Sequence, residues 1–254
     1  MSFFANLPLY LLALPIALLA LSVHETAHGY VAYKLGDPTA YSLGRLTLNP
    51  AKHFDPIGLI CMVIFRIGWA KPVPINTRYF KNPKRGMALS AAAGPVSNLV
   101  LALIFALLLR LEILLVDSFM QEELMNLAMA TSGAAVAVSG AIKFLSVLAY
   151  MLFIGVILNT SLAIFNLIPI PPFDGSRIAH VFLPAKWYFA IMKYEQIIMI
   201  VILVMFWIFP TRWLSNATSG LAFGILQIAG LKNGTPPVGT FNTLRYYVES
   251  ALTL

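Results

Sequence analysis

The sequence predicts an all-α, multi-pass membrane protein with about five to six transmembrane helices and a small cytoplasmic-side β-hairpin or re-entrant strand region. Three observations carry this prediction. Of the 254 residues, 59% are hydrophobic and only 11% are charged, whereas soluble domains carry about 25% charged residues. Several apolar runs are long enough to cross about 30 Å of hydrocarbon. Nine of the 17 Lys and Arg residues lie between Lys34 and Arg85, a clustering typical of a cytoplasmic segment.

We therefore interpret the basic residues behind the net charge of +7 as those that orient the protein in the membrane. We expect the basic residues to contact anionic lipid headgroups, and we expect no nucleic-acid partner. The single cysteine, Cys61, excludes an internal disulfide and a thiolate metal cluster. The N-terminus lacks the basic start and small-residue cleavage site of a secretory signal, so the first apolar segment is expected to remain in the protein.

The first span is predicted from about Phe3 to Val23, a stretch without charge. Its helix is expected to continue to about Leu35 and to end at Gly36. If Lys34 marks the cytoplasmic interface, a residue six to ten positions before it lies about 9–15 Å inside the membrane.

The segment that follows is too polar to span the membrane. Its one apolar run, PIGLICMVIF at 56–65, has ten residues, which suits a strand or re-entrant piece. The run KPVPIN follows, and its two prolines predict an extended edge strand. Such an edge could bind another extended peptide by strand addition. The candidate substrate-binding residues are Lys71, Pro72, Val73, Pro74, Ile75 and Asn76; a loop that covers the cytoplasmic face is the alternative.

A second span is predicted between Arg85 and Arg110. It begins with small residues that allow close helix approach. Asn98 is its one strong hydrogen-bonding side chain, either for helix packing or for support of a site. An acidic linker is expected after this span. The later apolar runs are a third span from near Phe144 to Asn166 and two shorter ones, Gln196–Thr211 and Trp213–Leu231.

His24, Glu25 and His28 form the motif HETAH at the end of the first apolar segment. Two histidines four residues apart project from one helix face and can hold a single metal ion. The glutamate between them can take a proton from a water at that metal. Ionisable groups in a membrane helix cost about 2.5–3.5 kcal/mol each on insertion scales, so three together indicate a function.

A catalytic zinc site usually has three protein ligands, and Asp174 is the best third candidate. It follows three prolines that end the third span, and Gly175 allows a tight turn after it. The first and third spans run in the same direction, so their ends should meet at one membrane level. His53 could be a fourth ligand, but a histidine bonded to backbone is the preferred interpretation, and His180 is expected to be structural.

HETAH and the later motif NLIPIPPFDG at 166–175 together resemble the site-2 protease family of intramembrane zinc metalloproteases. Phe173 stands where the family motif usually has leucine. The resemblance is to compact prokaryotic members without a PDZ or nucleotide-sensing domain. It implies one Zn²⁺ per chain held by His24, His28 and Asp174, with Glu25 as general base.

The resemblance also implies that Asn166 hydrogen-bonds the substrate backbone or stabilises the oxyanion. The substrates would be single-pass membrane proteins, cut within or near their transmembrane segments. The chain would form one membrane-embedded protease domain, 1–254, with a catalytic core at about 3–180. Accessory helices are expected at about 187–231 and a polar tail at 232–254. The expected location is the prokaryotic cytoplasmic membrane, with the active site nearer the cytosolic side.

Two other functions use the same residues. A metal-binding membrane transporter would need acidic groups along a path, and the spans supply few. An inactive membrane scaffold would not need an intact Glu25.

Overall fold

A computed structural model describes residues 7–53, 55, 58, 71–129, 140–182, 184, 186, 190, 193–208 and 212–231. The described part is helical and contains no strand. Its helices are α1 (Leu7–Lys34), α2 (Thr39–Ser42), α4 (Pro83–Met129), α5 (Gly140–Asn166), α6 (Asp174–Ala179), α8 (Glu195–Ile208) and α9 (Arg212–Ile228), with single turns η2 (Pro50–Lys52) and η3 (Thr77–Tyr79). This confirms the all-α prediction for the residues that the structure describes.

Three of these helices are long and apolar enough to cross a membrane: Tyr10–Lys34 in α1, Pro83–Leu115 in α4 and Val147–Asn166 in α5. They correspond to the three predicted main spans. The two shorter apolar runs form α8, with 14 residues, and α9, with 17 residues. The total of five to six spans therefore remains a prediction.

The end of α1 agrees with the sequence. The helix continues through the HETAH motif to Lys34, whose positive charge lies in its last turn and favours a helix C-terminus. Gly36 follows with φ +107°, a left-handed conformation that glycine adopts without a steric penalty. The Asp37 N–H donates to the Ala32 carbonyl at 3.0 Å and closes the turn. The predicted continuation to about Leu35 is confirmed.

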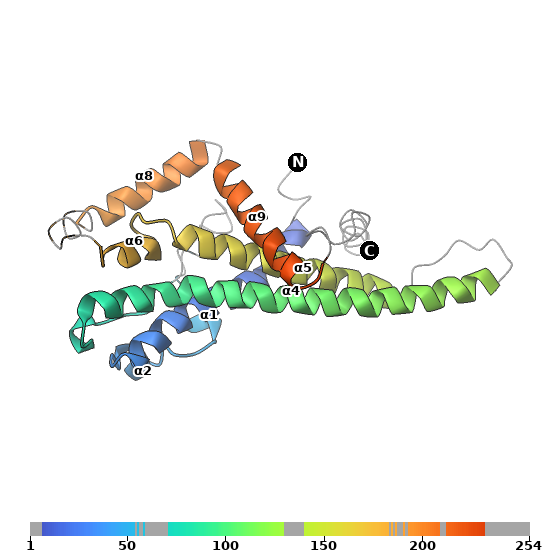
Figure 1. The fold of residues 1–254 in the computed structure, drawn as a ribbon, viewed down its shortest axis with the longest axis horizontal. Helices are drawn as coiled ribbons and strands as arrows, with labels where there is room; N and C mark the ends of the chain where they lie inside the picture. Colours follow the sequence, from blue (N-terminus) through green and yellow to red (C-terminus); the bar gives the residue numbers. More distant parts are fainter. Residues whose placement is uncertain are drawn as a thin grey trace. The chain divides into compact units, whose positions relative to one another are not determined.

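The acidic segment after Arg110, predicted to be a linker, is part of a helix. Helix α4 has 47 residues and passes through the acidic segment to Met129. Figure 1 draws it as one continuous helix. No Gly or Pro occurs between Val96 and Met129, and Leu, Ala, Met and Glu dominate, all good helix formers. Charges mark where a helix leaves hydrocarbon, but they do not end its hydrogen-bonding ladder.

The chain divides into two compact units. Unit 1 comprises Met1–Ile16, Leu101–Leu158 and Gly220–Leu254, and unit 2 comprises Ala17–Val100 and Asn159–Ser219. In unit 1, Gly155 of α5 packs on the Phe105 ring of α4, where an added Cβ would lie 2.6 Å from the ring. Close packing of this kind is typical of membrane helices, which associate through small residues. The candidate catalytic and metal-ligating residues lie in unit 2.

Three predictions fall on residues outside those described. The first is the strand or re-entrant run at 56–65, of which only Gly58 is described. The second is a packing role for Cys61, which we expect because a lone cysteine has no disulfide partner. The third is the polar tail from Lys232. The residues from Lys71 to Asn76 are described and have no regular secondary structure. Their role as an edge strand remains a prediction, as does the single-domain boundary.

Candidate metal centre

Within unit 2, α1 and α4 meet along two matching rows of residues. Both rows repeat every four positions: Ala20, His24 and His28 on α1, and Ser90, Gly94 and Asn98 on α4. The Asn98 amide contacts the first two residues of the α1 row, and the Ser90 carbonyl contacts His28. Later positions on α1 therefore pair with earlier positions on α4, so these helices run antiparallel. Four-residue rows are the ridges that helices commonly use to pack.

Gly94 makes room for both histidine rings. A Cβ at this position would lie 2.5 Å from Cε1 and Nε2 of His28 and 2.6 Å from Cε1 of His24. Even alanine would therefore displace the imidazoles. The small residue allows close helix approach, as the sequence indicates, and it lies directly at the candidate site.

Asp174 reaches the histidines because α6 begins immediately beside the end of α5. A Cβ at Gly175 would lie 2.3 Å from the Leu167 carbonyl oxygen and 2.5 Å from that of Ile168. Only glycine fits this backbone-to-backbone contact. Phe173 packs edge to face on Phe165, with ring centroids 4.4 Å apart. Phenylalanine at this position therefore packs the turn against α5.

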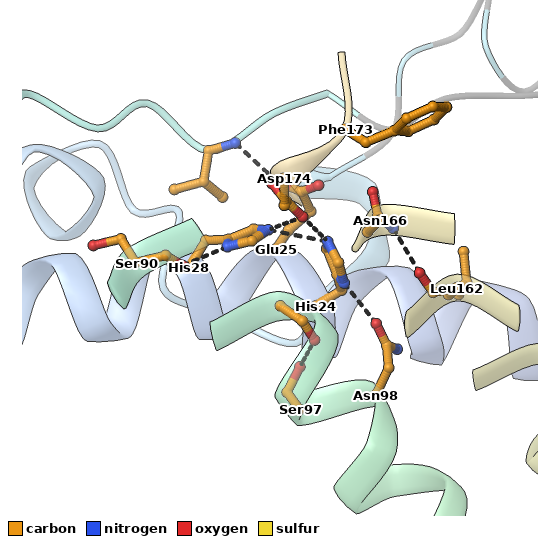
Figure 2. Close-up of polar contacts among 12 residues, drawn as sticks. His24, Glu25, His28, Ser90, Ser97, Asn98, Leu162, Asn166, Phe173 and Asp174 are labelled. Atoms are coloured by element: carbon orange, nitrogen blue, oxygen red, sulfur yellow. Dashed lines mark hydrogen bonds and ion pairs between the residues drawn. The ribbon is translucent and has the colours of Figure 1, made fainter. Parts of the chain in front are cut away.

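His24, His28 and Asp174 converge in a buried cluster (Figure 2). The two Nε2 atoms are 3.0 Å apart, and each lies 3.1 Å from Oδ2 of Asp174. Ligand atoms about 2.0–2.1 Å from a tetrahedral zinc would be about 3.3 Å apart. The observed separations are close to this spacing, so the cluster could hold one metal ion.

The partners on the far side of each ring determine which nitrogen is available. Nδ1 of His24 donates to Oδ1 of Asn98 at 2.5 Å, and Nδ1 of His28 donates to the Ser90 carbonyl at 2.7 Å. With the proton on Nδ1, the lone pair is on Nε2, the atom that faces Asp174. Such partners are typical of metal-ligating histidines. Two neutral imidazoles and one carboxylate form a set of three protein ligands, which suits catalytic zinc.

The charge state of Asp174 also suits a metal ligand. Burial raises the pKa of this carboxyl, but in the metal-free site protonated His24 and His28 donate hydrogen bonds that outweigh this effect and hold its pKa well below the usual range. The group is therefore an anion at neutral pH, as metal ligation requires.

Glu25 does not belong to this cluster. Its Oε2 accepts a hydrogen bond from the Val73 N–H at 3.0 Å. The general base suggested by the sequence is thus tied to the segment suggested for substrate binding. Neither motif indicates this contact.

Asn166 is the last residue of α5, and its Nδ2 donates to the Leu162 carbonyl at 2.9 Å within the same helix. Figure 2 shows it beside the turn that carries Phe173 and Asp174. None of the hydrogen bonds given for the described residues joins it to the three-residue cluster. Its catalytic role therefore remains a prediction.

The two other buried histidines stand outside the metal cluster. Nε2 of His53 contacts the Thr47 carbonyl at 2.7 Å, as expected for a histidine bonded to backbone. His180 ends α6. Burial, together with the positive charge of Lys84, lowers the pKa of His180.

Comparison with known proteins decides the family. The model of peptidase family M50 matches residues 12–209, which include both motifs and the whole buried cluster. The chain belongs to peptidase family M50. This assignment agrees with the resemblance to site-2 proteases and establishes a membrane-embedded zinc metalloprotease.

Relatives of this M50 chain carry consistent names. The candidate zinc metalloprotease YwhC of Bacillus subtilis is 40% identical over 189 residues, which cover 74% of this chain and 77% of the relative. The candidate zinc metalloprotease Rip2 of Mycobacterium tuberculosis is 27% identical over 229 residues, 88% of this chain and 76% of that protein. No solved structure matches the chain significantly.

Several supporting groups of this M50 site were missed from the sequence. Asn159 is fully buried in α5 and accepts a hydrogen bond from Nδ2 of Asn98 at 2.8 Å. An asparagine in an apolar span could have drawn attention to it. The Ser90 carbonyl and the Val73 N–H leave no sequence signal, because every residue except proline carries these backbone groups.

Proposed function

We propose that His24, His28 and Asp174 hold the single zinc ion of this M50 protease and that Glu25 is its general base. The observation that carries the proposal is the buried triangle of ligand atoms, with sides of 3.0, 3.1 and 3.1 Å. Its substrates are membrane-embedded proteins, as for the family. The specific proposal is that they are single-pass proteins cut within or near their transmembrane segments.

Each residue has a distinct task. Bound zinc would polarise the scissile carbonyl and lower the pKa of a water molecule. Glu25 takes the proton from the attacking water and passes it to the leaving amine. Asn98 and Ser90 keep the two imidazoles in the tautomer and orientation that ligation needs. Asn166 would contribute an amide donor to the substrate or the oxyanion after leaving its Leu162 contact.

The segment Lys71–Asn76 is proposed to bind the substrate in extended form. A fully hydrogen-bonded helix hides its carbonyl groups, so a transmembrane substrate must unwind before cleavage. Strand addition would hold the unwound form through backbone hydrogen bonds. The contact between Val73 and Glu25 supports this proposal, because it puts the segment beside the general base.

We also propose five membrane crossings, with α8 and α9 added to the three long helices, in the cytoplasmic membrane. The α8 side chains Ile197, Ile200, Val201, Val204 and Met205 are at least 49% exposed. An exposed apolar surface of this extent fits lipid rather than water. The basic segment from Lys34 to Arg85 favours a cytosolic location for the end of α1, and hence for the active site. A sixth crossing and the cytosolic hairpin would involve residues outside those described.

The decisive experiment is Glu25→Gln in purified full-length protein. We expect the variant to retain about one zinc per chain and to lose cleavage, because the base is removed and the ligands remain. Zinc is measured by elemental analysis, and cleavage is measured with a reporter whose single transmembrane segment is cut by the wild-type protein. Glu195→Gln in α8 is the matched control and should cleave normally.

The alternatives give different results. A metal transporter would retain zinc flux in Glu25→Gln vesicles. A scaffold would show no Glu25-dependent cleavage. Cleavage that persists in Glu25→Gln, or a wild-type chain without zinc, would refute the proposed roles.

A further inference from the structure

The Pro72–Val73 peptide group is held at both ends. Its N–H donates to Oε2 of Glu25 at 3.0 Å. Its carbonyl oxygen, on Pro72, accepts from a guanidinium nitrogen of Arg45 at 3.3 Å. One peptide group therefore connects a cation to the general base of the proposed function.

The neighbouring residues make this connection specific. Val73 stands between Pro72 and Pro74, and proline has no N–H to donate. No adjacent amide can replace that of Val73 if the segment slips by one residue. Val73 is also buried, so water does not readily substitute for its hydrogen bond.

Arg45 is buried, and its guanidinium donates to the Lys71 carbonyl at 2.7 Å as well as to that of Pro72. Among the described residues it has no carboxylate partner. One guanidinium nitrogen makes both contacts, and Nε has no hydrogen-bond partner among the described residues. These two hydrogen bonds therefore offset the cost of burying a cation without an anion. Hydrogen bonds from a charged donor are stronger than neutral ones, and one at the carbonyl polarises the N–H of the same peptide group.

Two further backbone contacts fix the segment along its length. The Lys71 N–H donates to the His53 carbonyl at 2.8 Å. The Asn76 N–H donates to Oδ2 of Asp37 at 2.6 Å, and Asp37 is fully buried just beyond the end of α1. Both ends of the segment are therefore anchored through their own N–H groups, which limits how far its central amide can move.

We propose that Arg45 is a positioning residue for catalysis, which acts on Glu25 through the Pro72–Val73 peptide group. Arg45 holds the carbonyl end of this group, and the N–H end holds one carboxylate oxygen of Glu25. The second oxygen then remains directed to proton transfer. This inference rests on the proposed function of Glu25 and adds the device that orients it.

The test uses zinc-loaded, full-length protein and the transmembrane reporter defined above. Val73→Pro removes the donor, and Val73→Ala keeps it with a similar loss of side-chain packing. We expect kcat of Val73→Pro to fall about 10²-fold below that of Val73→Ala at equal zinc content, because a displacement near 1 Å costs about that much. KM is compared for the Arg45 variants, since Arg45 lies outside the proposed substrate-binding segment.

The same loss of kcat is expected for Arg45→Met, and Arg45→Lys should recover part of it by restoring one charged donor. Arg78→Met, which removes an exposed cation nearby, is the matched control and should match the wild type. The double variant Arg45→Met/Val73→Pro should be no slower than the slower single variant, because both changes break one path.

Multiplied effects in the double variant, or kcat that falls only together with zinc content, would overturn the inference and leave a structural role for Arg45. So would normal kcat in Val73→Pro or in folded Arg45→Met. These results are separable from failure of the proposed function, which would appear as cleavage by Glu25→Gln or absence of zinc.

Discussion

At the scale of single residues, Asn98 shows how a buried amide can support a metal site. Its oxygen accepts from Nδ1 of His24, and its nitrogen donates to the Ala20 carbonyl at 3.3 Å and to Asn159 at 2.8 Å. Three helices are joined through one side chain. The choice between helix packing and site support is therefore not exclusive, because the same group does both.

Asn98→Ala should weaken zinc binding about 10–100-fold, the usual effect of removing the partner of a metal-ligating histidine. The affinity is measured by competition with a chromophoric chelator. Ser97→Ala is the control, because within the described part of the chain the Ser97 hydroxyl bonds only the Gly94 carbonyl of its own helix. Equal zinc affinity in Asn98→Ala and wild type would show that Asn98 serves packing alone.

At the scale of elements, the junction of α5 and α6 brings Asp174, the proposed third ligand, to the two histidines. The sequence predicts that prolines end the third span and that Gly175 allows a turn. What it does not reveal is how closely Gly175 approaches the backbone of residues 167 and 168. That distance depends on how two helices meet, and no local pattern encodes it.

Gly175→Ala should therefore shift α6 and impair zinc binding. The added Cβ would meet backbone oxygens at 2.3 and 2.5 Å, and an overpacked site of this kind typically loses about 1–3 kcal/mol of stability. We expect lower zinc occupancy after dialysis and a lower thermal unfolding midpoint. Gly220→Ala in α9 is the control, since its Cβ would meet nothing within 4 Å. A Gly175→Ala protein that holds zinc as tightly as wild type would contradict this account.

One sequence prediction about an element, the linker after the second span, is wrong. The sequence predicts an acidic linker after the second span, but this segment is part of α4, which continues to Met129. Hydropathy reports the surroundings of a helix, whereas helix length depends on breakers and caps. The same reasoning succeeded for α1, because Gly36 does supply a stop.

At the scale of the whole molecule, the topology predicts on which side of the membrane each end of α4 lies. In a Cys61→Ser background, Lys81→Cys should react with a membrane-impermeant maleimide in inside-out vesicles and be protected in intact cells, because Lys81 is exposed before α4 in the basic segment. Ser132→Cys, after α4 in the sequence, should show the reverse. Labelling of Lys81→Cys in intact cells would place the active site outside the cytosol.

The sequence by itself determined the chemistry: HETAH at the end of an uncharged span, and an aspartate after a proline-terminated one. These features are local, since four-residue spacing and span length follow from helix geometry alone. Only the tertiary structure decided which groups support the site. Asn98, the Ser90 carbonyl and the Val73 amide contact their partners across 74, 62 and 48 positions of sequence. Contacts over such separations depend on helix packing, and two of the three are made by backbone atoms that carry no residue identity.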